Sequence, residues 1–529
     1  MKSYLCRFPN AELSMNHSGG VFHAATFFLA KGKKYCQTIV RSVWQPSSRI
    51  PLKTPMPGIL EPRSQSRVTD TPIQTIPLRP ITYDEVGQHH TLESAYIVYN
   101  GLVYDITAFL PHHPGGTSVL RAALGTDITD TLRSMHHVDI GRMLESEVFR
   151  NKNGILLIGR IVDDERNSRN WIGRYSYQSR RRYDADDPMG EEIQSSVMAF
   201  LRREKLPLKK PIGECAFLIV MFYAAYMVTA YFAFIEGGTV ACLLLGPVCT
   251  FTAVNVGHTV MHGGFAKSRI LDLLGRCVWD FGGYSARTWD VEHQIHHQAP
   301  HSSIDLQTAP ETGVRFFEHQ QVRPHHRFQM AYLWFAFIFY SPVSWVMHTY
   351  GTLFKYPSVL MTDKLLHVGF KMIGFIIPIT LSFYLHGAWL AGFNLLVFAI
   401  SMSYFSLFTL FIQHEDSYLP EDGNEPWSVR QVVTSASWHT RNFVFEWFFG
   451  YFNYHTEHHL FPSLNPALYP KIQPIVRSIC EKYGVRYKYI SYVELVRSQI
   501  RAWSRYGQPL RIEAHHGEPA AVAGSSTNE

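Results

Sequence analysis

Four long apolar runs stand out along the chain, at 214–235, 239–257, 369–387 and 390–412. A helix needs roughly 20 apolar residues to cross a bilayer, so each run is long enough to span one. Short connections join the runs into two pairs, near Glu236–Gly238 and near His386–Gly387, and neither connection contains Lys or Arg. The pattern predicts two helical hairpins whose turns face away from the cytosol, with both termini in the cytosol.

A fifth apolar run, 330–349, differs in composition from these four. It contains Pro342, is rich in Tyr, Trp and Phe, and follows the basic residues Arg323 and Arg327. Aromatic residues beside basic ones are typical of the membrane interface. We expect this run to lie along the cytosolic interface, so that four helices span the membrane.

The segments outside the apolar runs divide into distinct regions. Residues 1–75 are basic and acid-poor, which suits a disordered extension or an organelle transit peptide. Residues 77–163 have a globular texture, with two β-type runs around Asn100-Gly101, a strong hairpin signal. Residues 164–205 are expected to form a linker and a surface helix, 206–500 the membrane domain, and 501–529 a C-terminal tail.

Charge and composition narrow the class of protein. Charged residues make up 17% of the 529, against roughly 25% in soluble proteins. The net charge of +6 comes without a Lys/Arg stripe, so we expect no nucleic-acid partner and a weak attraction to an anionic membrane surface. The seven cysteines form no CxxC pair. The 27 histidines are the outlier, and many are clustered.

Three histidine clusters follow the predicted hairpins. Spacings of i, i+3 and i+4 place histidines on one face of a helix, aimed at a common point. Imidazole is a good ligand for ferrous iron and suits zinc equally, but a zinc site needs three or four ligands, whereas eight are enough for two metals. The clustered residues are His258, His262, His293, His296, His297, His455, His458 and His459.

A different histidine pattern lies in the N-terminal globular region. His112-His113-Pro114-Gly115-Gly116 follows the predicted hairpin, and His136-His137 comes further on. Strand, turn and motif resemble the cytochrome b5 family. The resemblance implies that haem b is held by His113 and, at the family's 24-residue spacing, by His137. Two axial imidazoles suit haem iron to passing electrons.

The three clusters and their flanks resemble the membrane fatty-acid desaturase and hydroxylase family. Together with the haem region they resemble front-end fatty-acid and sphingolipid desaturases. The resemblance implies two iron ions, O2 as co-substrate, and a ninth ligand just after the fourth span, where His414 stands. One position departs from the pattern: front-end enzymes usually have Gln where this chain has His455.

The expected fold is therefore an α+β haem domain followed by an all-α membrane domain with four spanning helices and a histidine-rich cytosolic cap. The expected function is oxygen-dependent desaturation of the acyl chain of a fatty acid or other membrane lipid. Electrons would pass from NADH-cytochrome b5 reductase through the haem. The expected location is the endoplasmic reticulum membrane, or a plastid membrane if residues 1–75 are a transit peptide.

Other classes of function remain to be separated from this one. A lipid hydroxylase would use the same metal ligands. A membrane-anchored haem electron carrier would need only two histidines and one span, leaving the other clusters unexplained. A metal or proton transporter would carry histidines within its spans, whereas these stand at span ends and in the segments between them.

Overall fold

The computed structural model describes residues 78–508 of the chain, except for gaps at 114–119, 121–122, 130–131, 133–135, 137–139, 163–168, 173–174, 179–186, 266–267, 299, 301–312, 316–320, 348–349, 351–352, 356–358 and 415–424. The predicted extension at 1–75 and most of the predicted C-terminal tail therefore lie outside the described residues, as does His137.

The N-terminal region is an α+β domain built on one mixed sheet, in the order β1-β5-β3-β2-β4. The predicted hairpin is confirmed: β2 (Tyr96–Tyr99) pairs antiparallel with β3 (Leu102–Asp105), and Asn100 and Gly101 take positive φ values of 48° and 71°. Such φ values at both turn residues favour Asn-Gly. The remaining elements are β1 (Pro80–Ile81), α2 (Tyr83–Gln88), β4 (Thr126–Asp127), α5 (Ile140–Glu145), α6 (Glu147–Asn153) and β5 (Leu156–Ile161).

The predicted linker holds more structure than its polar composition suggested. Two strands, β6 (Arg169–Ile172) and β7 (Tyr175–Gln178), form an antiparallel hairpin. The expected surface helix is α7 (Pro188–Arg203), capped by Asp187, whose side chain accepts from Gly190 N. One face of α7, with Ile193 and Val197, is buried against the C-terminal part of the chain. It is therefore an amphipathic packed helix and not a purely surface one.

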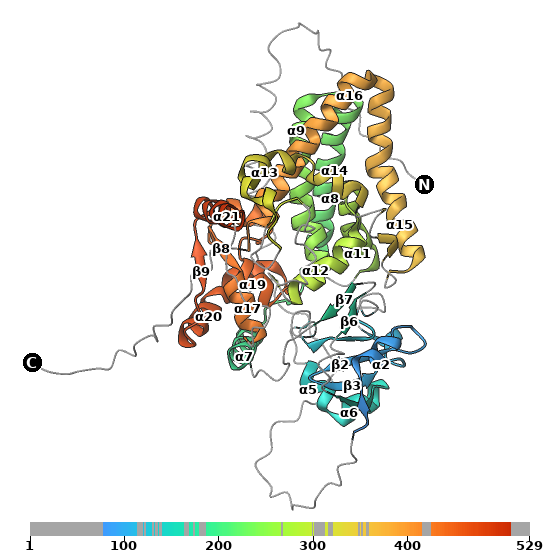
Figure 1. Ribbon diagram of the computed structural model, residues 1–529, viewed down its shortest axis with the longest axis vertical. Coiled ribbons are helices and arrows are strands. Elements are labelled where there is room, and N and C mark those ends of the chain that lie inside the picture. Colours follow the sequence, from blue (N-terminus) through green and yellow to red (C-terminus); the bar gives the residue numbers. More distant parts are fainter. Residues whose placement is uncertain are drawn as a thin grey trace, which may run out of the picture. The chain divides into compact units, whose positions relative to one another are not determined.

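Long apolar helices between residues 212 and 410 form a bundle (Figure 1). In the described part, three helices are long and apolar enough to cross a membrane: Ile212–Ile235, Thr239–Met261 and Met361–Leu410. The third has 50 residues and leaves helical geometry at Gly387, where φ is 74° and ψ is 169°. It therefore turns back on itself into two legs, visible as the paired α15–α16 ribbons of Figure 1.

These legs and the first two helices correspond to the four predicted apolar runs. The elements are α8 (Ile212–Ala230) with η2 (Tyr231–Ile235); α9 (Thr239–Thr252) with η3 (Ala253–His258) and α10 (Thr259–Met261); and α15 (Met361–Lys371) with η7 (Met372–Ile376), α16 (Ile377–Ser406) and η8 (Leu407–Phe411). Helices α9 and α16 approach closely at Gly246, where a Cβ atom would lie 2.5 Å from Met402 N. Small residues allow this kind of packing between membrane helices.

The fifth apolar run does not form a spanning helix. It contains α13 (Gln329–Ile338) and α14 (Tyr340–Val346), of 10 and 7 residues. Neither reaches the roughly 20 residues that a crossing needs. That the run does not cross as one helix agrees with the prediction, while its place at the interface stays a prediction.

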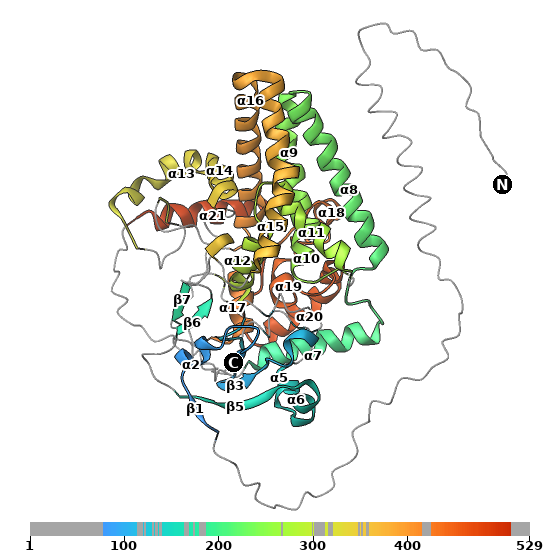
Figure 2. The ribbon, with the colours of Figure 1, turned by 90° about the vertical axis from the view of Figure 1, so that its right-hand side faces the viewer.

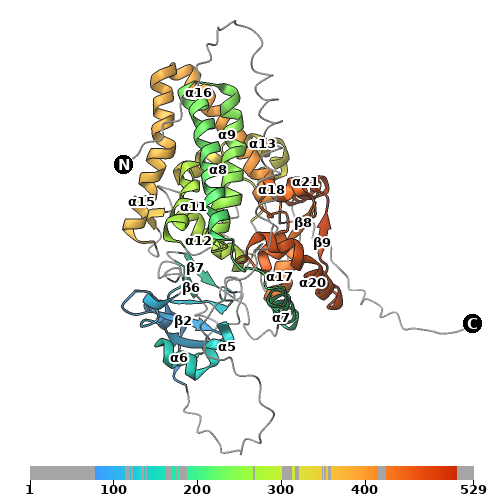
Figure 3. The ribbon, with the colours of Figure 1, turned by 180° about the vertical axis from the view of Figure 1, so that it is seen from behind.

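The remaining elements form a cap at one end of the bundle (Figures 2 and 3). They are α11 (Arg269–Phe281), α12 (Ala286–Gln298), α17 (Trp427–Thr434), β8 (Ala436–Trp438), α18 (Phe443–Phe448), α19 (His455–Leu460), α20 (Tyr469–Lys482), β9 (Lys488–Ile490) and α21 (Tyr492–Tyr506). The all-α expectation is wrong in one detail, because β8 pairs in parallel with β9. Strands of three residues are too short to show a recognisable alternation in the sequence.

Candidate metal centre and haem site

Four separate segments bring nine histidines together. His258 and His262 stand at the end of the second long helix, His414 follows η8, three histidines lie on α12 and three on α19. All nine are buried, none being more than 8% exposed. The structure thus assembles the whole predicted set: His258, His262, His293, His296, His297, His414, His455, His458 and His459.

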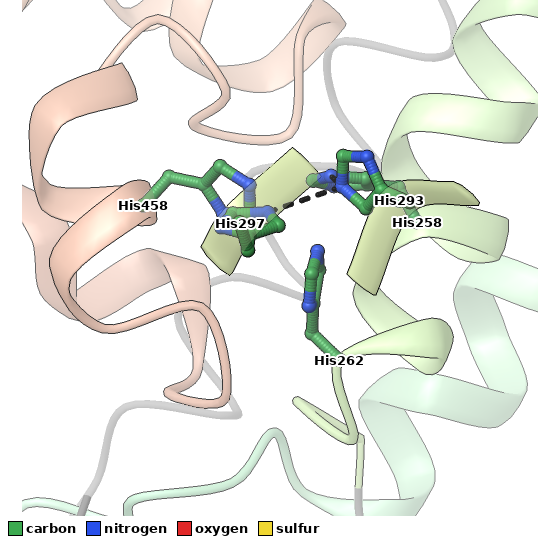
Figure 4. A group of neighbouring side chains, drawn as sticks. All are labelled: His258, His262, His293, His297 and His458. Carbon is green, nitrogen blue, oxygen red and sulfur yellow. Dashed lines mark hydrogen bonds between the residues drawn. The ribbon is translucent and has the colours of Figure 1, made fainter. Parts of the chain in front are cut away.

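The first group contains five imidazoles that face one another (Figure 4). One nitrogen from each lies within 4.8 Å of the corresponding nitrogens of the other four, in His258, His262, His293, His297 and His458. The Nε2 atoms of His258 and His293 are 2.9 Å apart, and those of His293 and His297 are 3.2 Å apart.

The second group lies beside the first. His296, His414 and His459 place one nitrogen each within 4.8 Å of the others. His455 joins them, because its Nε2 lies 3.0 Å from Nε2 of His414 and its ring centroid is 4.6 Å from that of His459. The nine histidines therefore divide into sets of five and four.

The HxxHH spacing explains how one helix serves both groups. On α12, His293 and His297 stand four residues apart and enter the first group, while His296 enters the second. On α19 the pattern is reversed: His458 enters the first group, and His455 and His459 the second. Each helix thus presents two adjacent faces, one to each group.

The chemistry of these groups fits metal ions. Several buried nitrogens have no hydrogen-bond partner among the described residues: both of His262, Nδ1 of His297 and of His455, and Nε2 of His458 and of His459. Leaving a buried polar atom unsatisfied costs roughly 1–3 kcal/mol. Burial also lowers the pKa of His297, His458 and His459 well below its ordinary value, which keeps these rings neutral. Neutral imidazole is the form that binds metals.

Helix α17 holds two of the rings in place. Nδ1 of His459 lies 2.8 Å from Oε1 of Gln431, and Nδ1 of His414 lies 3.1 Å from the carbonyl oxygen of Thr434. Gln431 Nε2 also donates to the carbonyl oxygen of His297, at 3.2 Å. With Nδ1 so occupied, Nε2 of each ring is left to face the centre. Sequence reasoning missed Gln431 and Thr434, since no spacing motif marks them.

An aromatic wall borders the first group. Trp289 stacks on His293 with centroids 5.2 Å apart, and Trp279 stacks on Trp289 at 4.5 Å. Both tryptophans line a small internal cavity of about 10 Å³ between α9, α11 and α16. Its other lining residues include Ala253, Met402 and Leu410. The cavity is about the size of one water molecule, and its lining is mostly apolar.

A third group of potential ligands lies apart from the nine histidines. One ligand atom each from Cys277, Asp280 and His367 lies within 4.8 Å of the other two. His367 Nδ1 lies 2.5 Å from Asp280 Oδ2, and Asp280 Oδ1 accepts from Ala286 N at 3.2 Å. The Asp280 carboxylate thus already has partners, and it connects α15 to the first residue of α12. We interpret this group as a brace for α12 and not as a further metal site.

The N-terminal domain places two histidines face to edge. The rings of His113 and His136 have centroids 6.2 Å apart and an interplanar angle of 78°. Imidazole nitrogens lie roughly 2 Å from a bound transition metal, so two rings on opposite sides of one iron have centroids roughly 6 Å apart. Nδ1 of His136 lies 3.2 Å from the carbonyl oxygen of Leu132. The described residues thus place His113 beside the second predicted histidine pair, whose other member, His137, lies outside them.

Comparison with known families agrees with both sites. Residues 82–152 match the family described as cytochrome b5-like haem/steroid binding domain, and residues 237–491 match the family described as fatty acid desaturase. The chain carries a fatty acid desaturase domain behind a cytochrome b5-like domain. As a fatty acid desaturase it is an oxidoreductase, and it is a membrane protein with several apolar helices.

Relatives of this desaturase are distant in sequence. It is 25% identical to a probable Delta(5) fatty acid desaturase C of Dictyostelium discoideum, over 77% of this chain and 90% of the relative. Its identity to a Delta(8)-fatty-acid desaturase 1 of Arabidopsis thaliana is 24%, over 78% and 90% of the two chains. An sn-1 linoleoyl-lipid 6-desaturase of Arthrospira platensis is 27% identical over 56% of this chain and 86% of its own.

Proposed function

We propose that this desaturase introduces a cis double bond into the acyl chain of a fatty acid or membrane lipid, using O2 and two iron ions. The observation that carries the proposal is the division of nine buried imidazoles into adjacent groups of five and four. Two irons with O2 would supply the oxidising power to break an unactivated C–H bond, which side chains cannot do by themselves.

The residues of the chain have separate roles in this proposal. His258, His262, His293, His297 and His458 would hold one iron, and His296, His414, His455 and His459 the other. Their burial excludes bulk water and keeps the ring nitrogens neutral. The apolar residues around Trp279 and Trp289 would have to move apart to receive part of the acyl chain, because the cavity between them, of about 10 Å³, has the size of one water molecule.

Electrons would enter through the haem b of the cytochrome b5-like domain, supplied by NADH-cytochrome b5 reductase. We propose His113 as one axial ligand and His137 as the other, at the 24-residue spacing of the cytochrome b5 family. His137 lies outside the described residues, and the ring of its neighbour His136 lies 6.2 Å from that of His113. The proposed location is the endoplasmic reticulum membrane with both termini in the cytosol, or a plastid membrane if residues 1–75 are a transit peptide.

Names of the relatives support desaturation over hydroxylation, since all three are named as desaturases. Their names also differ in double-bond position, and one specifies a lipid-linked substrate. The histidine set binds metal in the same way for either reaction. The proposal is therefore limited to desaturation of an acyl chain.

Lipid profiling of a desaturase-deficient host that expresses the full chain tests this function. We expect a new cis-unsaturated acyl chain with the unaltered protein and none with His458→Ala. The exposed His325 provides the matched control, and His325→Ala should retain the product. Metal analysis of the purified protein should find two irons per chain. A hydroxylated lipid as sole product, or one zinc and no iron, would overturn the proposal.

A further inference from the structure

A short aromatic helix in the cap exposes an apolar face. Helix α18 has the sequence Phe-Val-Phe-Glu-Trp-Phe, and its exposed residues are Phe443 (76%), Val444 (56%), Trp447 (46%) and Phe448 (41%). The one charged group of the helix, Glu446, is directed away from this face: its Oε1 accepts from Tyr454 Oη at 2.6 Å and from Arg441 N at 3.0 Å. The exposed face of α18 therefore carries no charge.

Helix α18 packs against the second long helix as well as against the rest of the cap. Asn255 Nδ2 donates to the carbonyl oxygen of Phe448, at 2.7 Å. The ring of Phe251 lies 5.2 Å from that of Phe448 and 5.6 Å from that of Phe449. Gly450 is needed here, since a Cβ atom at that residue would lie 2.7 Å from Asn255 Oδ1. Figure 2 shows α18 alongside the bundle, above α10 and α19.

The position of this contact along the long helix sets its depth. Val240, Leu243 and Leu244 are exposed apolar residues near the start of Thr239–Met261, so we place the start of the hydrocarbon close to Thr239. At 1.5 Å per residue, Phe251 lies about 18 Å further along the axis and Asn255 about 24 Å. The hydrocarbon core is about 30 Å thick. The contact with α18 therefore lies between about 6 Å and about 12 Å inside the core, measured from the cytosolic side.

We propose that α18 is immersed in the acyl-chain region of the cytosolic leaflet, with lipid tails as its binding partner. Four large apolar side chains on a helix face without a charged group suit that environment. The exposed Arg441 at the helix start can extend its guanidinium towards the lipid phosphates. The inference goes beyond the proposed reaction and does not depend on it.

Immersion of α18 brings lipid close to the metal centre. Phe452 follows α18 in the chain, and its ring lies 4.7 Å from that of His455, 4.9 Å from His258 and 5.5 Å from His458. Between the lipid-facing Phe448 and the histidines stand aromatic side chains of this one segment and of α9. Only a thin layer of aromatic side chains would thus separate the acyl chains of the bilayer from the candidate metal centre.

Site-directed fluorescence quenching in vesicles tests the immersion. The five described cysteines are buried, and the other two, Cys6 and Cys36, are replaced by Ser in every variant. The native thiols that remain are then the five buried ones. Val444→Cys would carry an environment-sensitive fluorophore in the full-length protein, reconstituted in phosphatidylcholine vesicles with a spin-labelled phosphatidylcholine. Leu243→Cys, on the exposed face of α9, serves as the lipid-facing control, and Glu481→Cys, exposed on α20, as the aqueous control.

We expect the spin-labelled lipid to quench the Val444 probe as strongly as the Leu243 probe, and iodide to quench it several-fold less than the Glu481 probe. Phe443→Cys, the most exposed position of α18, repeats the test if Val444→Cys does not fold. A probe quenched by iodide as at Glu481 would overturn the proposal. So would a probe protected from both quenchers, which would indicate a protein partner on α18. Because neither readout uses turnover, failure here leaves the proposed reaction separately testable by lipid profiling.

Discussion

Each well-anchored imidazole of the metal centre uses its two nitrogens differently, and this division sets the direction of the ring. His459 has Nδ1 against Gln431, and His414 has Nδ1 against the carbonyl oxygen of Thr434, so Nε2 of each faces inwards. Gln431 acts on both groups at once, because it also donates to the backbone of His297. Gln431 thus helps to orient histidines of both groups although it belongs to neither.

Replacing Gln431 should weaken metal binding without removing a ligand. Gln431→Leu keeps the bulk of the side chain but loses both hydrogen bonds, and losing such a partner typically lowers metal affinity by roughly 10–100-fold. Gln431→Glu keeps an acceptor for His459 and should lose less. Iron retained by each variant against a graded series of chelator concentrations measures the effect. Equal retention by Gln431→Leu and the unaltered protein would show that ring orientation does not depend on α17.

The haem ligands form a second test at the residue scale. The family spacing selects His137 as the partner of His113, while the ring of the neighbouring His136 lies 6.2 Å from that of His113. We expect His113→Ala and His137→Ala each to lose the low-spin bis-histidine absorbance spectrum in the full-length protein. His112→Ala and His136→Ala should retain it. A spectrum lost in His136→Ala and kept in His137→Ala would assign the second ligand to His136.

At the scale of elements, apolar length was the most informative feature of the sequence. The four predicted runs coincide with helical legs, because a stretch of about 20 apolar residues has few alternatives to a membrane helix. The histidine spacing likewise predicted that the histidines of α12 and α19 would lie on adjacent helix faces directed at common points, as they do. Features that depend on distant partners were not predictable: the burial of Ile193 on α7, the β8–β9 pair, and the division of the histidines into two groups.

The two short helices α13 and α14 decide the topology. The histidine groups draw on residues before and after these helices, so the second and third clusters must lie on the same side of the membrane. The chain must then cross an even number of times between them, and the two legs of Met361–Leu410 already supply two crossings. Helices of 10 and 7 residues cannot add a third.

A cysteine at Thr362 tests this topology. Thr362 is exposed and lies in the first turn of α15, which is the next α-helix after the two short ones. We expect an impermeant thiol reagent to label Thr362→Cys from the cytosolic side of sealed microsomes. Thr239→Cys, at the start of α9, should react only after permeabilisation. Labelling of Thr362→Cys only after permeabilisation would mean that α13 and α14 together cross the membrane. The number of crossings between the second and third histidine clusters would then be odd, and these clusters could not share one metal centre.

At the scale of the whole molecule, the candidate metal centre is where the fold buries polar side chains at the greatest cost in free energy. The nine histidines come from four segments of the chain, and His297 and His455 are more than 150 residues apart in the sequence. They converge in a buried site that excludes water. Several of their nitrogens have no protein partner in the described chain. Metal ions therefore stand to stabilise the fold as well as to provide chemistry, since binding energy to the folded chain alone adds to its stability.

The metal-free protein should accordingly be sensitive to acid. Burial lowers the pKa of His262, His297, His455, His458 and His459 well below the ordinary value of about 6.5 that they have when unfolded. Below that pH the unfolded chain binds more protons than the folded one, so the stability is full above about pH 6.5 and is lost as the pH falls. Each ring contributes up to about 1.4 kcal/mol per pH unit. The apparent Tm of chelator-treated protein in detergent should therefore fall steeply from about pH 7 to pH 5. His458→Leu should flatten the slope and the exposed His325→Ala should leave it unchanged, whereas a Tm that did not vary across this range would mean that water reaches the rings.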